Sequence, residues 1–251
     1  MVVGYVPNRN PIKNHFLRLI GGPNFIRRIQ APIILRMLDL EKGETLLDAG
    51  CGGGFFTWEI SHICECAGID LEIPDSLAYA SRMSSRMSVV AGNVTSLPFR
   101  SSSFDKILLS SVLQMVCDDK SLLRECNRVL KDNGIMVLSV PSDFIWIDRL
   151  NEMKARLLRK FGSRGKGFYT VNEITGLLLD ERFEILEVER SPKKLGSLVY
   201  ESWLYVCVRA GLPLFHPAYF FIQYPLGIID KIANKKNNGI EILVKARRHS
   251  S

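Results

Sequence analysis

The sequence contains no long uninterrupted apolar run, although 47% of its 251 residues are hydrophobic. A membrane-spanning helix needs about 20 consecutive apolar residues. The most apolar stretch, residues 195–229, is broken at Glu201, Arg209, Gly211, Pro213, Pro217 and Pro225. We therefore expect no transmembrane helix. The N-terminus also lacks the apolar core of a secretory signal, which predicts a cytoplasmic protein.

The sequence also has no two pairs of cysteines at the spacing of a metal site. The chain has six cysteines, and Cys64 and Cys66 have no second pair that would complete a zinc site. We expect free, buried thiols in a reducing compartment, and no metal site. Internal repeats and low-complexity segments are absent as well. A chain of this length can bury a full core as one domain with an elaboration.

Positive charge is in excess, with a net charge of +7 and a pI of about 9.1. The segment from Lys154 to Lys166 contains no acidic residue. Such a balance favours an anionic partner, which could be nucleic acid, a membrane surface or a phosphorylated substrate. Charge alone does not choose between these partners.

A glycine-rich turn is the most informative feature that the chain does have. The apolar run Thr45 to Ala49 predicts a buried strand, and a helix is expected from Phe55 onward. A dinucleotide fingerprint would need glycine at position 55. The spacing is instead D-x-G-x-G-x-G, from Asp48 through Gly50 and Gly52 to Gly54. Backbone amides of such a turn can contact a ligand directly.

Two further polar residues follow the next predicted strands. Asp70 ends the strand Cys66 to Asp70, about 20 residues after the glycines, where a carboxylate can bind both hydroxyls of a ribose. Asn93 follows a short third strand, in the segment Gly92-Asn93-Val94-Thr95-Ser96-Leu97-Pro98-Phe99. Its amide oxygen can accept a hydrogen bond from a ligand.

These motifs, together with Ser103-Phe104-Asp105, resemble those of the class I S-adenosylmethionine (SAM) dependent methyltransferases, over about residues 40 to 190 and the last strand. The resemblance implies an α/β fold, a doubly wound sheet of seven strands with helices on both faces, in which strands one to six are parallel and the seventh is antiparallel. We expect an N-terminal helical cap at 1–40, a SAM-binding core at 41–194, a hydrophobic helical insertion at 195–232, and the final strand and tail at 233–251.

The resemblance also assigns cofactor-binding roles. Asp48 and the backbone at Gly50, Gly52 and Gly53 would hold the methionine moiety of SAM, and Asp70 the ribose. Asn93 and Val94 would bind the adenine, and Ser111 and Val112 would lie near the methyl group. The remaining predicted cofactor-binding residues are Ala49, Cys51, Leu71, Ser110 and Met115.

A catalytic base is not identified by the sequence. Related O-methyltransferases often carry a histidine where this chain has Met115, and a thioether cannot take a proton. A base is needed only when the nucleophile, such as a sugar hydroxyl, must lose its proton. His15, Asp143 and Tyr169 are candidates by position.

The stretch 195–229 combines aromatic residues with prolines and has basic flanks. It fits in-plane attachment to the inner face of a membrane, or a tunnel for an apolar substrate. A buried helical hairpin and a subunit interface are the alternatives. This aromatic, proline-rich insertion resembles those of methyltransferases that act in cell-surface glycan assembly on polyprenyl carriers.

Four functions are compatible with these features. The first is O-methylation of a lipid-linked or glycan-type hydroxyl, and the second is C-methylation of a polyprenyl quinone-type ring. Nucleic-acid methylation is the third, and the N-P-P-Y-type motif of amino-methylating enzymes is absent after the fourth strand, where Ser110-Ser111-Val112-Leu113 stands. The fourth is a SAM-binding, membrane-associated protein without catalytic activity.

Overall fold

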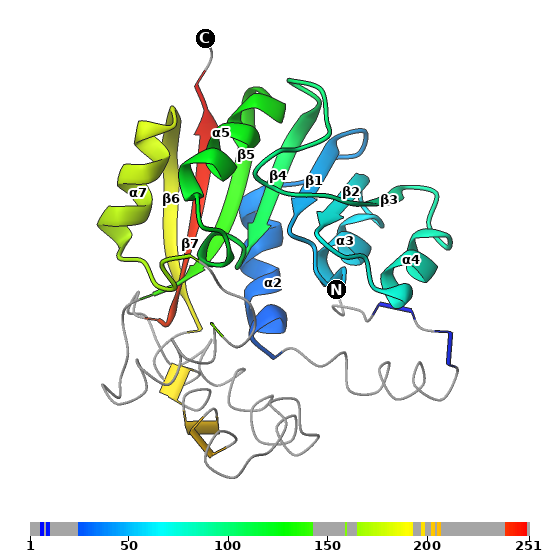
Figure 1. The fold of residues 1–251 in the computed structure, drawn as a ribbon, viewed down its shortest axis with the longest axis horizontal. Coiled ribbons are helices and arrows are strands. Elements are labelled where there is room, and N and C mark those ends of the chain that lie inside the picture. The colour runs from blue at the N-terminus through cyan, green and yellow to red at the C-terminus, as the bar shows by residue number, and fades with distance from the viewer. Residues whose placement is uncertain are drawn as a thin grey trace.

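The computed structural model describes residues 25–142, 165–192 and 239–249, together with positions 6, 7, 9, 10, 159, 197, 198, 202, 203, 205 and 206. The predicted helices at 12–20 and 144–161 lie outside or almost wholly outside these residues, as does most of the insertion. The structure therefore shows the core of the chain, from helix α2 to the last strand (Figure 1).

A seven-stranded sheet forms this core, with the order β3-β2-β1-β4-β5-β7-β6. Its strands are β1 (Thr45–Ala49), β2 (Glu65–Asp70), β3 (Met87–Ala91), β4 (Phe104–Ser110), β5 (Leu130–Pro141), β6 (Phe183–Ser191) and β7 (Glu241–Arg248). The pairs among β1 to β5 are parallel, and β7 runs antiparallel to both β5 and β6. This confirms the predicted fold class. The order reverses at β1 and β4, and ligands of such sheets bind beyond the carboxyl ends at this point.

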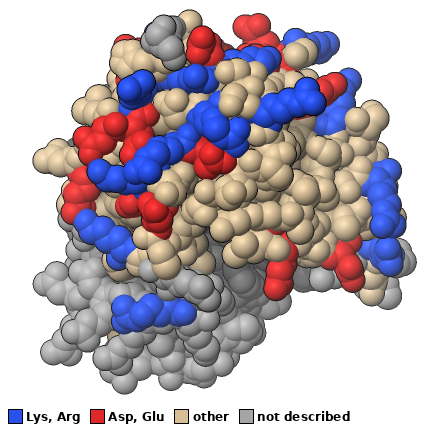
Figure 2. All heavy atoms as spheres, turned by 45° about the horizontal axis from the view of Figure 1, so that its top comes forward, with Lys and Arg blue, Asp and Glu red and all other residues tan. Residues whose placement is uncertain are grey.

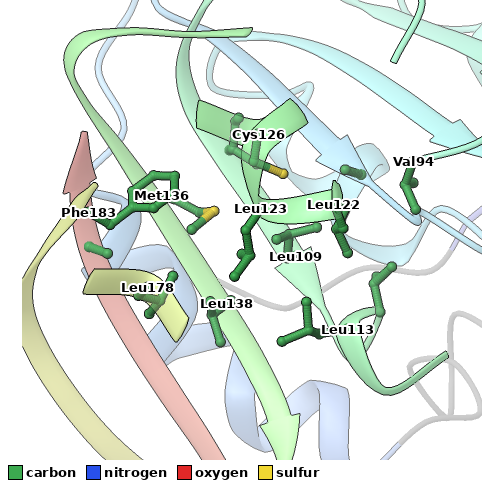
Figure 3. Packing of buried hydrophobic residues seen from close by; sticks show 14 of the residues in the cluster. Val94, Leu109, Leu113, Leu122, Leu123, Cys126, Met136, Leu138, Leu178 and Phe183 are labelled. Carbon is green, nitrogen blue, oxygen red and sulfur yellow. The ribbon is translucent and has the colours of Figure 1, made fainter. Parts of the chain in front are cut away.

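Helices cover both faces of the sheet, because successive side chains of a strand point to opposite faces and the central strands are apolar on both. Helices α2 (Phe25–Leu38) and α3 (Phe55–Ile60) pack with Leu46, Leu108, Val137 and Leu243 on one face. Helices α5 (Asp119–Val129) and α7 (Val171–Asp180) cover the other face (Figure 1). There Leu122, Leu123, Cys126 and Leu178 meet Leu109, Met136 and Leu138 (Figure 3). The short helices α4 (Asp75–Ser81) and η1 (Leu113–Met115) complete the described elements.

Helix α2 begins earlier than the sequence indicates. Pro32 suggests a break before a helix at Ala31 to Leu40, but α2 runs from Phe25 to Leu38 with Pro32 inside it. Proline lacks the amide that would bond to the preceding turn. Pro32 faces solvent, and the wholly buried Ala31, Ile34 and Leu38 hold the helix on the sheet. The tertiary packing therefore outweighs the lost hydrogen bond.

The pattern of Thr170 followed three residues later by Glu173 predicts a capping box at the start of a helix, and this box is present before α7. Thr170 accepts a hydrogen bond from the Glu173 amide at 3.1 Å, and Glu173 accepts one from the Thr170 amide at 2.8 Å. Lys166 pairs with the Glu173 carboxylate. This hydrogen bond and those from Thr170 lower the pKa of Glu173 to about 2. These contacts fix the chain between residue 165 and α7.

Basic residues at the amino ends of the strands are interleaved with acidic ones (Figure 2). Lys106 pairs with Glu44, Lys131 with Asp105, and Arg248 with Asp132. On the face shown, the positive charge is thus divided by carboxylates and does not form one continuous patch. Within the described part of the chain, no helix has the length and apolar character needed to cross a membrane.

Candidate active site at the carboxyl edge of the sheet

The glycine turn connects β1 to α3, as the sequence predicts. Gly50 has φ 78°, and a Cβ on it would meet Val112 Cγ2 at 2.3 Å. Glycine at this position therefore lets the turn and the segment after β4 touch. At Gly52 and Gly53 a Cβ would meet no atom within 4 Å, so the backbone of these residues is open. Ala49 and Cys51 bury their side chains in the core, and the Cys51 amide donates to the Ile69 carbonyl at 3.0 Å, which holds the turn against β2.

Asp70 is fixed at the end of β2 by two backbone amides. Its Oδ2 accepts from the Gly52 amide at 2.7 Å, and its Oδ1 accepts from the Leu71 amide at 2.8 Å. Each carboxylate oxygen can accept a further hydrogen bond. The half-buried carboxylate is therefore held in place and retains acceptor capacity for the two hydroxyls of a ribose.

Leu71, Asn93 and Val94 lie after the carboxyl ends of β2 and β3. Leu71 is 71% exposed, and Val94 is buried. The amide oxygen of Asn93 accepts from the Thr95 amide at 3.0 Å and from the Thr95 hydroxyl at 2.9 Å. Two donors use the two lone pairs of this oxygen. The Asn93 NH₂ group, which can only donate, is thus the part left for a ligand.

Asp48 is buried at the end of β1. Its Oδ2 accepts from the Thr57 hydroxyl on α3 at 2.6 Å, and the side chain is 2% exposed. Burial raises the pKa of this carboxyl to about 6, although Thr57 and the positive charge of Arg27 oppose the shift. A cationic ligand beside Asp48 would favour its ionised form.

Four buried polar residues, which we name the polar row, lie on the α2 face near the carboxyl ends of the central strands. They are Asp48 on β1, Ser110 on β4, Ser139 on β5 and Glu241 on β7, with exposures of 2%, 6%, 0% and 9%. The register accounts for this grouping. Asp48, Ser110 and Ser139 each follow an apolar residue of the α2 face by two positions, and Glu241, on the antiparallel strand, precedes one by two positions; these apolar residues are Leu46, Leu108, Val137 and Leu243.

Helix α2 supplies partners to the polar row. Arg27 donates to the carbonyl oxygen of Ser110 at 2.9 Å and also to its hydroxyl. Gln30 donates to Glu241 Oε2 at 3.3 Å, and the Ser111 hydroxyl donates to the same oxygen at 3.3 Å. Sequence reasoning missed Arg27, Gln30 and Glu241. The helical spacing of Arg27, Gln30, Ile34 and Leu38 was the available signal for the first two.

The predicted cofactor residues thus come together, whereas the side chain of Tyr169, the candidate base that the structure describes, lies in the core. Tyr169 is 1% exposed in the core under α5 and α7, and its hydroxyl donates to Asp119 at 3.4 Å. Burial and the nearby Asp119 carboxylate raise the pKa of Tyr169, so its hydroxyl stays protonated. His15 and Asp143 lie outside the described residues. Met115 ends η1, beside Val112 and close in sequence to the polar row.

The donor and acceptor set at this edge fits SAM. Gly52 and Gly53 leave room for main-chain contact, and Asp70 offers acceptors for a ribose. Leu71, which directly follows Asp70 and is 71% exposed, provides apolar surface for an adenine ring. The Asp48 carboxylate suits the positive charge of the ligand.

Comparisons with known proteins agree with this geometry. A family model described as a methyltransferase domain matches residues 47–138, from β1 to β5. The solved structure of a SAM-dependent methyltransferase from Mesorhizobium loti superposes with a TM-score of 0.61 and 22% identity, over 90% of this chain and all of that one. At this identity the superposition shows the fold alone.

Curated relatives extend the match along the chain. An uncharacterized protein of Methanocaldococcus jannaschii is 28% identical over 204 residues, which are 72% of this chain and 78% of the relative. A ubiquinone biosynthesis O-methyltransferase of Bradyrhizobium diazoefficiens is 27% identical over 71% of each chain. A demethylmenaquinone methyltransferase of Mycolicibacterium paratuberculosis is 31% identical over 48% of this chain and 53% of its own length.

Several further relatives, named probable SAM-dependent methyltransferases, are matched over about half of their length. The glycine turn, the seven-stranded sheet and the matching family model lead to one assignment. Residues 47–138 form the methyltransferase domain that the family model describes, and the chain has the fold of the class I SAM-dependent methyltransferases, which implies SAM as its cofactor.

Proposed function

We propose that this protein transfers a methyl group from SAM to a hydroxyl of an amphiphilic acceptor, of a lipid-linked or glycan type. The observation that carries the proposal is the polar row. Burying polar groups is costly unless they are hydrogen-bonded, yet the row places two hydroxyls and two carboxylates at the edge where ligands of this fold bind. Such groups can bind and orient a hydroxyl-bearing acceptor.

Each part of the site has a separate task in this proposal. SAM supplies a methyl group bonded to a positively charged sulfur, and this charge is lost during transfer. The backbone at Gly52 and Gly53 holds the methionine moiety, Asp70 holds the ribose, and Leu71 and Val94 pack on the adenine. The protein contributes by aligning the two reactants in a site from which water is excluded.

The share of this chain that each relative matches supports methylation at oxygen over methylation at carbon. The relative named ubiquinone biosynthesis O-methyltransferase is matched over 71% of this chain, and the demethylmenaquinone methyltransferase over 48%. Methylation of a quinone-type ring carbon remains the second candidate, because the latter relative is the more identical of the two, at 31%. Methylation of a ring carbon would depend less on a catalytic base than methylation of a hydroxyl does.

The stretch 195–229 is proposed to contact the membrane or the apolar part of the acceptor. Among its described residues, Leu198, Tyr205 and Val206 are 40%, 42% and 46% exposed. Exposed apolar and aromatic side chains with basic flanks suit an anionic lipid surface. Flotation with anionic phosphatidylglycerol vesicles should be lost when the three residues are replaced by serine. Equal flotation of the triple variant would contradict this contact.

Transfer of tritium from methyl-labelled SAM to a total lipid extract of the source organism tests the function. We expect label in the organic phase that depends on the protein. Hydriodic acid cleaves methyl ethers and leaves methyl groups on carbon, so release of the label as methyl iodide would show O-methylation. Label that resists cleavage would favour the ring carbon, and an unlabelled organic phase would contradict both.

A further inference from the structure

Glu241 is a buried carboxylate at the carboxyl edge to which sequence reasoning assigns no role. It is the first residue of β7, it pairs with Pro141 at the end of β5, and it is 9% exposed. Its Oε2 accepts from Gln30 on α2 and from Ser111 after β4, both at 3.3 Å. Residues from two distant segments therefore converge on one carboxylate oxygen of β7.

The amide of Gln30 indicates that this place holds a further polar group. Gln30 is wholly buried, and its Oε1 has no hydrogen-bond partner within the part of the chain that the structure describes. Turning the amide around would bring its oxygen against the Glu241 carboxylate, so the observed orientation is the favourable one. A buried acceptor without a donor is costly, and a hydroxyl of a bound molecule would supply that donor.

Ser111 connects this carboxylate to the site of methyl transfer. It directly follows β4, which is next to the glycine turn in the sheet, and Val112 after it touches Gly50. Ser111 has φ 54°, a left-handed conformation that residues other than glycine rarely adopt. Its amide donates to the Ser139 carbonyl at 3.0 Å. Ser111, next to the polar row, is thus a strained residue whose hydroxyl is directed at Glu241.

We propose that Glu241 is the catalytic base of the reaction, and that Gln30 and Ser111 complete a subsite for the acceptor hydroxyl. The acceptor oxygen forms a bond to the methyl carbon as the carbon–sulfur bond of SAM breaks, and that electron pair goes to sulfur. The hydroxyl proton goes to Glu241. Before transfer, the reacting hydroxyl donates to Glu241, and a second hydroxyl of the acceptor donates to Gln30 Oε1. This inference rests on the proposed O-methylation.

The key variant is Glu241→Gln, which keeps the shape of the side chain and removes its basicity. We expect the rate of label transfer to lipid extract to fall by about 10²- to 10⁴-fold, the usual contribution of a general base. SAM affinity, measured by calorimetry, should stay within about twofold. Glu184→Gln is the matched control, because Glu184 is a half-exposed carboxylate at the opposite end of the sheet, paired with Arg247.

A chromogenic diol gives a readout that does not depend on turnover. 4-Nitrocatechol absorbs at longer wavelength when it ionises, and it can be titrated while bound to the complex with S-adenosylhomocysteine. Among the residues that the structure describes, Arg27 donates to Ser110 of the polar row, Asp48 belongs to the same row, and Arg190 donates to the carbonyl of Gly239, two residues before Glu241. These groups are the same in wild type and in Glu241→Gln. A carboxylate beside the bound hydroxyl disfavours its ionisation, so the probe should ionise about one pH unit higher on wild type than on Glu241→Gln.

The outcomes separate this inference from the proposed function. If Glu241→Gln transfers label at the wild-type rate, or if its KM changes while its kcat does not, Glu241 is not the base. The proposed O-methylation would still stand. Equal ionisation of the probe on both variants would lead to the same conclusion. Absence of label transfer by wild type would overturn the proposed function, and this inference with it. Glu241→Asp, which keeps the charge, should recover part of the lost rate.

Discussion

The Gly52 amide donates a 2.7 Å hydrogen bond to Asp70 Oδ2, which joins the glycine turn after β1 to the end of β2. These two residues are 18 positions apart, and each was predicted to contact a different part of the cofactor. The bond sets the distance between the methionine-binding turn and the ribose-binding carboxylate. A change at Asp70 should therefore affect both.

Asp70→Ala is expected to weaken SAM binding by about 100-fold, measured by calorimetry. Two charge-assisted hydrogen bonds to the ribose hydroxyls contribute about 1.5 kcal/mol each, which gives a factor of this size. Glu72→Ala is the matched control, because Glu72 is an exposed acid two residues further along. If both variants bind SAM as tightly as wild type, the assignment of Asp70 to the ribose is wrong.

Asn93→Asp should tighten SAM binding by about fivefold. In wild type both lone pairs of the Asn93 amide oxygen are used by Thr95, so only NH₂ faces outward. An aspartate keeps the Thr95 contacts through one oxygen and offers the second to the adenine amino group. One such bond contributes about 1 kcal/mol.

Asn93→Ala separates this effect from a general change in the loop. It removes the Thr95 contacts and adds no acceptor, so SAM binding should not improve. Tightening by alanine as well as by aspartate would show that the adenine amino group is not held at this position.

The sequence predicts the glycine turn, the succession of strands along the chain and the capping box because each depends on local chemistry. β1 has the predicted bounds, since apolar residues and glycines mark both of its ends. The Thr170–Glu173 box needs only two residues at a spacing of three. Asp70 and Asn93 follow the strands expected of them, because the family pattern fixes their distance from the glycines.

The polar row could not be predicted in this way, because its members come from four strands and its partners from a fifth element. Glu241 opens an alternating strand, where a charged residue is ordinarily exposed. Only the antiparallel pairing of β7 with β5 turns it toward α2. Strand β5 also begins at Leu130, earlier than the expected Ile135, because Leu130 pairs with Phe104 across a register shift.

Gly50→Ala should lower the free energy of unfolding by about 3 kcal/mol, measured by urea denaturation. The new Cβ would lie 2.3 Å from Val112 Cγ2, and alanine is disfavoured at φ 78°. Adding Val112→Ala removes the clash and leaves only the backbone cost. The double variant should thus lose less stability than the sum of the two single variants. Strict additivity would mean that the two side chains do not compete for space.

The last prediction concerns the pH dependence of Asp48. Burial raises its pKa from 3.8 to about 6, so the folded state binds this proton more tightly than the unfolded state. The stabilisation from the protonated form is complete below about pH 4 and is lost as the pH rises through about 6. A shift of this size corresponds to about 3 kcal/mol. Wild type should therefore lose about that much stability relative to Asp48→Asn between pH 4 and pH 7.

Asn is a suitable reference because its amide oxygen can still accept the Thr57 hydroxyl, which bonds to Asp48 at 2.6 Å. Urea denaturation of both proteins at several pH values measures the difference. Arg27→Gln should enlarge it, because the positive charge of Arg27 lowers the pKa of Asp48 and so favours the ionised carboxylate. A difference that is constant between pH 4 and pH 7 would show that Asp48 titrates normally and is solvated. Saturating SAM should reduce the pH dependence, since a cationic ligand stabilises the ionised carboxylate and binds only the folded protein.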